Sequence, residues 1–204
     1  MRLLRRWQGV LVGCTVSFCV IWPSDVQAAS TAFSKEVSAV LERRINVLRE
    51  LAADPVILQA VRESNVKHQD LTLPDILTLD RKWIAKDKGV ETFVKSLLTN
   101  TCANRLMVFQ DAHDGYPELF IADAKGVNVC MTNRTSDYYQ ADEEWWVKGY
   151  RNGQGETFYG AIEYDESAMS ESIPVFLPVM DPETSKAIGV MKVIVDITAI
   201  KREL

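Results

Sequence analysis

The chain has 204 residues, a formal net charge of −5 at pH 7 and 47% hydrophobic residues. This length and apolar content are enough for one domain with a real core. The acidic balance argues against nucleic acid and anionic lipid as partners.

The N-terminal segment 1–28 has the features of a targeting sequence. A basic region with three arginines precedes an apolar stretch from Val10 to Trp22, and Val26-Gln27-Ala28 has the small-residue pattern of a cleavage site. The apolar stretch is shorter than the roughly 20 residues that a membrane-spanning helix needs. We therefore predict a cleaved signal peptide and a periplasmic protein. The alternative is an uncleaved signal that anchors the chain in the inner membrane.

Helical periodicity dominates the first half of the remaining chain. Apolar residues at three- and four-residue steps predict a long helix over 31–64. Asp54-Pro55 interrupts this pattern, and Asp54 is placed to cap a following helix that has Pro55 at its first position. Shorter helices are predicted over 71–86, 90–98 and 103–111, so that the second helical part spans 71–111.

Strand patterns follow from Glu118 onward. Residues 118–122 and 127–132 are predicted to form a hairpin around a turn at 123–126. Further strands are expected over 157–164, 172–180 and 188–197, with a turn at 181–186. Helices followed by a mostly antiparallel sheet indicate an α+β fold. The sequence thus predicts a single domain over 29–204 whose sheet part spans 118–198.

The segment 135–146 is rich in aromatic residues, with Tyr138 beside Tyr139 and Trp145 beside Trp146. Aromatic rings with a few placed charges are typical of the lining of a small-molecule pocket. The alternative is that these rings fill one end of a core. Taken as a group, they favour a pocket.

Charged residues on the last strands are further candidates for the site. Asp165 follows Tyr164 at a strand end, where a side chain faces a cleft or bonds a turn. Lys192 interrupts an apolar strand and shares a face with Val190 and Ile194. It either pairs with an acid such as Glu163 on a neighbouring strand or reaches into a pocket.

No catalytic set stands out in the sequence. Glu143-Glu144 could be an acid pair, but the first turn of a helix capped by Asp142 explains these residues as well. Gly153-Gln154-Gly155 lacks the lysine of a phosphate-binding loop and is interpreted as a turn. We expect no enzymatic activity and no cofactor.

Histidines and cysteines limit metal and redox chemistry. His68 and His113 lie far apart without the spacing of metal ligands, so no metal site is expected. Cys102 and Cys130 are an even pair in a compartment that permits disulfides. A bridge between them and two separate buried thiols both remain open.

Several stretches, taken in order, carry a resemblance to a known family. They are Leu51-Ala52-Ala53-Asp54-Pro55, the hairpin 118–126, the aromatic segment with Trp145-Trp146, and the strand 187–193. The chain resembles the extracytoplasmic Cache (PDC, PAS-like) sensor domain of bacterial receptors, over 31–197.

The resemblance implies a central PAS-like antiparallel sheet, with the long helix on one side and a ligand pocket on the other. It places Tyr139, Trp145 and Trp146 in the pocket wall and Asp165 at the far end. With Tyr164 and Lys192 from the strand pattern, these are the predicted ligand-binding residues. Asp165 matches the position whose carboxylate meets a ligand amine. Glu143 stands where amino-acid-binding members carry an arginine, so the resemblance favours an amine or another cationic metabolite.

The expected function is that of an exported ligand-sensing module without an output domain, which acts with a separate membrane receptor or kinase. Weak parallel dimerisation is expected through the apolar stripe of Phe33, Val37, Val40 and Ile45. One alternative is a periplasmic adaptor that docks a partner protein. Another is a small periplasmic hydrolase that uses Glu143 or Asp165.

Overall fold

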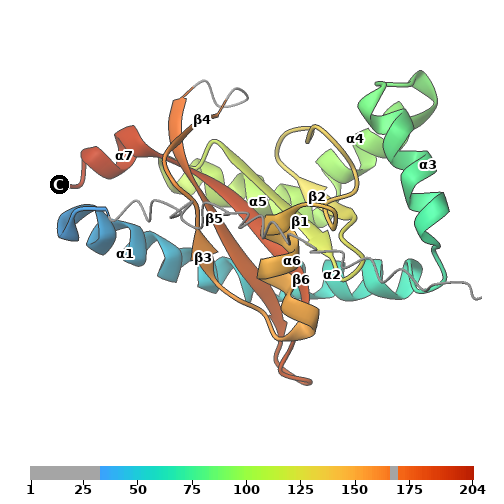
Figure 1. The fold of residues 1–204 in the computed structure, drawn as a ribbon, viewed down its shortest axis with the longest axis horizontal. Helices are drawn as coiled ribbons and strands as arrows, with labels where there is room; N and C mark the ends of the chain where they lie inside the picture. Colours follow the sequence, from blue (N-terminus) through green and yellow to red (C-terminus); the bar gives the residue numbers. More distant parts are fainter. Residues whose placement is uncertain (1–32, 166–169) are drawn as a thin grey trace, which may run out of the picture. The chain divides into compact units, whose positions relative to one another are not determined.

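The computed structural model describes residues 33–165 and 170–204. In these residues a six-stranded antiparallel sheet packs against helices (Figure 1). The α+β class expected from the sequence is therefore confirmed. The predicted signal peptide lies outside the described residues. Nothing in the described part of the chain forms a helix long and apolar enough to cross a membrane.

Helices α1 to α5 begin and end within a few residues of the predicted positions, whereas α7 was not predicted. Their bounds are α1 Lys35–Ala52, α2 Pro55–Lys67, α3 Leu73–Ile84, α4 Glu91–Thr99, α5 Thr101–Ala112, α6 Glu144–Tyr150 and α7 Ile197–Lys201, with 3₁₀ turns η1 Lys88–Val90 and η2 Arg151–Gly153. The interruption at Asp54 is confirmed, because the Asp54 Oδ1 accepts a hydrogen bond from Val56 N at 2.9 Å and Pro55 starts α2. The strand predicted to reach residue 197 ends one residue earlier, because Asp196 caps α7 through Thr198 N.

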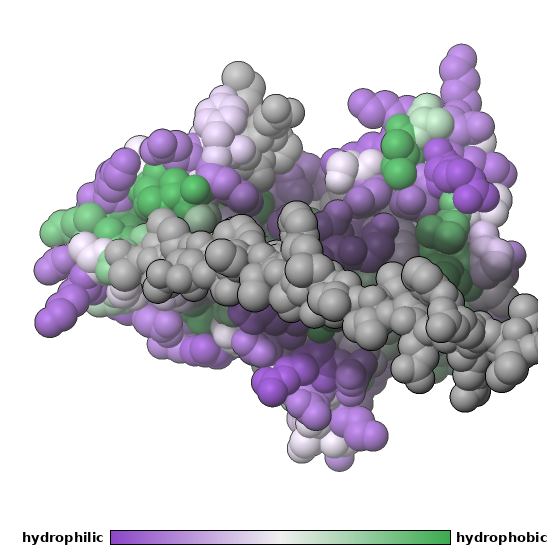
Figure 2. Space-filling view, viewed as in Figure 1, coloured by the Kyte–Doolittle hydropathy of each residue, from purple (hydrophilic) through white to green (hydrophobic). Residues whose placement is uncertain are grey.

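The strands are β1 Glu118–Asp123, β2 Asn128–Met131, β3 Phe158–Tyr159, β4 Glu163–Asp165, β5 Ser170–Asp181 and β6 Lys186–Asp196. Their order in the sheet is β2-β1-β6-β5-β3, and β4 also pairs with β5. Hydrophilic residues gather over the turn between β5 and β6 on the face shown in Figure 2, as the predicted turn requires.

The single strand predicted over 157–164 is wrong, because β3 and β4 are separate short strands along β5. The break lies opposite Pro174, which has no N–H to donate to a neighbouring strand. Gly160 N donates to Pro174 O at 2.9 Å, and a Cβ on Gly160 would meet Pro174 Cγ at 2.8 Å. Pro174 therefore ends the ladder locally.

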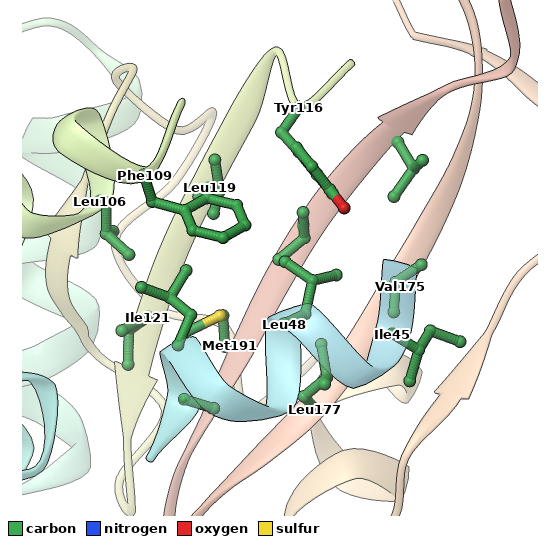
Figure 3. Packing of buried hydrophobic residues seen from close by; sticks show 14 of the residues in the cluster. Ile45, Leu48, Leu106, Phe109, Tyr116, Leu119, Ile121, Val175, Leu177 and Met191 are labelled. Carbon is green, nitrogen blue, oxygen red and sulfur yellow. The ribbon is translucent and has the colours of Figure 1, made fainter. Parts of the chain in front are cut away.

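The main core lies between the sheet and the helices α1, α2, α5 and α7. Alternation along β1 points Leu119 and Ile121 into this core, where they meet Leu48 and Phe109 (Figure 3). The next residue, Phe120, belongs to a second cluster under α3 and α4. Both faces of the sheet are thus covered, and the second face carries the aromatic segment.

A disulfide joins the helical part to an edge of the sheet. The Cys102 and Cys130 sulfurs are bonded, with their Cα atoms 5.8 Å apart. Cys102 lies in the first turn of α5, and Cys130 lies on β2, an outer strand of the sheet. The bridge therefore ties this outer strand to the core helices.

Candidate functional site

A row of side chains crosses the second face of the sheet. Phe120 on β1 and Phe176 on β5 are the direct register partners of Lys192 on β6. Phe158 on β3 is the partner of Phe176 and extends the row. Directly opposed residues in antiparallel strands place their side chains on one face. Lys192 therefore stands between two phenylalanines.

Helix α6 places Trp145 over this row. Its ring stacks on Phe176 with the ring centres 5.3 Å apart and meets Phe120 edge-on at 5.8 Å. The Lys192 Nζ lies 5.4 Å from the centre of the Trp145 ring, 5.7 Å from Phe120 and 6.0 Å from Phe176. These distances lie within the range of cation–π attraction, about 6 Å. The ammonium group is surrounded by three rings.

The charge of Lys192 has no acidic partner in the described part of the chain, where no carboxylate forms an ion pair with it. Glu163, the partner considered from the sequence, pairs in register with Ser172, four positions along β5 from Phe176. Lys192 is half-buried. By contrast, Lys148 of α6 lies 4.0 Å over the Phe158 ring and 3.8 Å from Glu156. The row is cationic and apolar, and this combination suits an anion.

The aromatic segment is held in place from α3. Asp80 Oδ1 accepts hydrogen bonds from Tyr138 N at 2.8 Å and from Tyr139 N at 3.1 Å. Trp83 Nε1 donates to Thr135 O at 2.9 Å. These bonds satisfy backbone groups that a sheet would otherwise pair. They fix where the segment runs before α6 begins.

The two tyrosines of this segment differ in burial. Tyr138 is 1% exposed and packs between Trp83 and Phe93 with ring centres 5.6 and 5.3 Å away, so it belongs to the core. Burial raises its pKa. Tyr139 is half-buried beside the same cluster. Its pKa is raised mainly by burial and to a smaller extent by the negative charge of Asp142. Both hydroxyls stay neutral at pH 7.

Trp146 is also a core residue. It is 8% exposed, packs against Ala122 and Val190, and stacks on Tyr150 with ring centres 4.7 Å apart. Its buried Nε1 has no hydrogen-bond partner among the described residues. The two adjacent tryptophans therefore contact different parts of the sheet, and only Trp145 reaches Lys192.

The structure does not bring Tyr164 to the row. Tyr164 pairs with Glu171, five residues along β5 from Phe176, which corresponds to roughly 17 Å of strand. Glu171 shares the alternation of Ile173 and Val175, which point into the core under α1. Tyr164 is 62% exposed. Asp165 ends β4 beside it, and its side chain lies outside the described part.

The acids before α6 do not form the expected cap. The helix begins at Glu144, and Glu143 occupies the N-cap position without a side-chain hydrogen bond. Capping by Asp142 is therefore wrong, because the first helical bonds run from Trp146 N and Val147 N to the Glu143 carbonyl. Glu144 does lie in the first turn, as predicted.

Sequence reasoning missed a serine, histidine and aspartate cluster that joins α2 to β1. Ser64 Oγ donates to Asp123 Oδ2 at 2.9 Å, and His68 Nδ1 lies 2.8 Å from the same oxygen and 3.2 Å from Ser64 Oγ. A catalytic triad needs the serine and the acid on different ring nitrogens, whereas both contacts here use Nδ1. The cluster ties α2 to β1 through hydrogen bonds and lacks the geometry of a triad. The four-residue spacing of Ser64 and His68, which places them one helical turn apart, was the sequence signal that could have revealed this contact.

The described residues also contain no group of three or more His, Cys, Asp or Glu side chains that could hold a metal ion.

Comparison with known proteins gives structural matches alone, since no family model and no curated protein matches the chain. The structure is similar to the sensor domain of DcuS from E. coli, with 16% identity, a TM-score of 0.46 and coverage of 82% of this chain and 96% of that domain.

Two further matches cover less of the other protein. The ligand-binding domain of the Campylobacter jejuni chemoreceptor Tlp3, in complex with L-valine, gives 12% identity and a TM-score of 0.38 over 84% of this chain and 67% of that one. The sensor domain of the V. cholerae histidine kinase DctB gives 16% identity and a TM-score of 0.36, and the match covers 71% of this chain and 57% of that one. The three matched proteins are sensor or ligand-binding domains.

Proposed function

We propose that this chain is an extracytoplasmic sensor domain that binds a small organic anion, such as a carboxylate, over Lys192. The observation that carries the proposal is the Lys192 ammonium among three aromatic rings, without an ion-pair partner in the described part. A half-buried charge without a counter-ion loses hydration that a bound carboxylate would replace. The rings would cover the carbon skeleton of the ligand.

An anion fits this geometry better than the amine favoured by the sequence. The amine expectation depended on Glu143, Asp165 and the aromatic rings acting together, but Asp165 lies on β4, which pairs with a part of β5 distant from Phe176. Lys192 would repel an ammonium group at the position where Trp145 lies. The charge therefore selects ligands of the opposite sign.

A binding screen tests the proposal. Thermal shift and calorimetry with mono- and dicarboxylates should give hits at millimolar ligand or below, and amines of equal size should give none. Lys192→Met keeps the apolar stem and removes the charge, so we expect the hits to weaken by about tenfold or more. Lys192→Arg should keep part of the affinity. Lys148→Met is the matched control, because Lys148 has Glu156 as a partner.

Each rival function gives a different outcome in the same screen. Amine hits that survive Lys192→Met and disappear in Asp165→Asn would restore the amine ligand. Turnover of a hit, lost in Glu143→Gln, would support the hydrolase. No hit at all, together with a stable partner in pull-downs, would support an adaptor.

We also infer that the chain is exported. The support is the arginine-led apolar segment before Ala28. N-terminal sequencing of the exported protein should find a mature chain that begins at Ala29. A start at Met1 in a membrane fraction would instead support the anchored alternative.

A further inference from the structure

A cavity of about 390 Å³ lies where α1, α7 and the loop before β1 meet. Its lining includes three arginines, Arg43, Arg44 and Arg202, with His113 and Tyr116, and two acids, Asp114 and Glu203. It shares none of the residues of the Lys192 row. Its chemistry is independent of the proposed function.

Arg44 is built into the wall of this cavity. Its side chain is only 10% exposed, its Nη1 donates to Asp114 O at 2.8 Å, and its guanidinium lies 5.1 Å from the centre of the Tyr116 ring. Gly115 makes room for this arrangement. It has a φ of +86°, and an added Cβ would meet Ala199 Cβ at 2.3 Å and Arg44 Nη1 at 3.1 Å. The guanidinium is therefore held in one position before any ligand arrives.

The carboxylate of Glu203 already contacts the arginines of this cavity. Glu203 Oε1 accepts from Arg44 Nε at 2.9 Å and also lies beside Nη2, while Oε2 is 3.5 Å from Arg43 Nη2. Glu203 follows the end of α7 and its side chain is 38% exposed. Nε and Nη2 of Arg44 thus converge on one carboxylate oxygen. This is the edge of the guanidinium that arginine also uses to bind carboxylates and phosphates.

Removing Glu203 would leave the cavity cationic. Three arginines would then face one carboxylate, that of Asp114, which Arg202 contacts at 2.6 Å in an exposed pair. Exposed pairs contribute little, whereas the buried Arg44 would lose its only carboxylate partner in the described part of the chain. A buried guanidinium without a counter-ion is unfavourable. The site would attract an oxyanion from solution.

We propose that this cavity is an anion site in which a small carboxylate or phosphate takes the place of the Glu203 side chain on Arg44. Glu203 is tethered nearby, so its effective concentration is in the millimolar range. A free anion therefore displaces it from the wild-type protein only at comparable concentrations. The displaced segment 202–204 would then leave its contacts with α1.

Calorimetry with inorganic phosphate and with acetate at low ionic strength tests this site. Glu203→Gln removes the competing charge and should bind phosphate at least about tenfold more tightly than the wild-type protein. Adding Arg44→Met should abolish the gain, and adding Lys192→Met should leave it unchanged. Near-UV circular dichroism checks that each variant is folded. If Arg44→Met does not fold, the exposed Arg43→Gln replaces it and should remove part of the gain.

A second experiment, with vesicles of phosphatidylcholine and phosphatidylglycerol, distinguishes a free anion from a lipid headgroup as the ligand. Phosphate binding without vesicle binding assigns the site to a free anion. Arg44-dependent sedimentation of Glu203→Gln with vesicles, without phosphate binding, assigns it to a lipid headgroup. The proposal is overturned if Glu203→Gln binds neither probe more tightly than wild type, or if the gain survives the loss of Arg44.

Discussion

At the scale of residues, the adjacent tryptophans separate the roles of ligand contact and core. Successive residues of an α-helix are turned by about 100°. On α6 this rotation directs Trp145 to Lys192 and Trp146 to Ala122 and Val190. Helix α6 thus covers Lys192 with Trp145, and the buried Trp146 fixes the helix on the sheet.

Replacing the two tryptophans should therefore have opposite effects. Trp146→Ala is expected to cost about 3–5 kcal/mol of unfolding free energy, the range for a large buried ring, with ligand affinity retained well below the melting point. Trp145→Ala should cost less stability and should lower carboxylate affinity by roughly thirtyfold, about 2 kcal/mol. Urea denaturation and calorimetry measure the two effects. The reverse result would place Trp146 in the ligand site.

Asp137 should make stability depend on pH. Burial is the main cause that raises its pKa, and Asp80, Glu143 and Asp142 add to it, while a hydrogen bond from Gln140 opposes it. Because the folded state binds this proton more tightly than the unfolded state, the protonated carboxyl contributes to folding stability. This contribution is full below the unfolded-state pKa, about 3.9, and is lost as pH rises through the folded-state pKa. Asp137→Asn should therefore gain stability relative to wild type from pH 4 upward, measured by urea denaturation at several pH values. A constant difference between the two proteins at every pH would reject this cause.

At the scale of elements, α3 positions the aromatic segment through one carboxylate. Asp80 is 9% exposed and accepts two backbone N–H groups of the segment. Its loss leaves both donors unpaired, and hydrogen bonds to charged groups contribute about 1.5–3 kcal/mol. The position of Trp145 therefore depends on a residue that touches no ligand.

We expect Asp80→Ala to lower the unfolding free energy by about 2–3 kcal/mol and to weaken ligand binding. Asp80→Asn, which keeps an acceptor oxygen, should retain most of both. Denaturation and calorimetry on the same samples check this. Equal binding by Asp80→Ala and wild type would show that the segment holds its position without α3.

The disulfide should be an important constraint between α5 and β2. Cys102 and Cys130 are 28 residues apart, and closing a loop of this size contributes about 3–4 kcal/mol in the chain-entropy description. The Cys102→Ala, Cys130→Ala double variant should lose roughly this amount in urea denaturation. A reductant should lower the stability of the wild type toward that of the variant and leave the variant unchanged. Equal stability of the oxidised wild type and the variant would contradict the bridge.

At the scale of the whole molecule, most of the apolar stripe of α1 is buried against the rest of the chain. Val40 and Ile45 are 2% and 1% exposed, whereas Phe33 and Val37 are half-buried. A stable interface needs about 800 Å² from each partner. The face left on α1 offers little apolar surface for a second copy, so we predict that any dimer through this face is weak.

Sedimentation should find a monomer at micromolar concentration. Any dimer at high concentration should disappear in Val37→Glu. Glu42→Lys is a control on the exposed side of the same helix. A dimer at micromolar concentration, unaffected by Val37→Glu, would show that another surface mediates association.

The sequence by itself determined most of the elements and their order, but not α7 or the division between β3 and β4. Periodicity placed the helices, Asp54-Pro55 marked the start of α2, and the turn at 123–126 predicted the hairpin of β1 and β2. These features are local, since propensity, capping and turn chemistry act over a few residues. The same local signals identified Trp145 and Lys192 as candidates for the site.

Only the tertiary structure decided which candidates meet. Lys192 lies between Phe120 and Phe176 because three strands distant in sequence share one register, and Tyr164 is excluded because β4 joins β5 beyond Pro174. The Arg44 cavity likewise needs both ends of the described chain. Register and packing depend on contacts between distant residues, and no local pattern encodes them, because one shift along a strand turns every side chain to the other face.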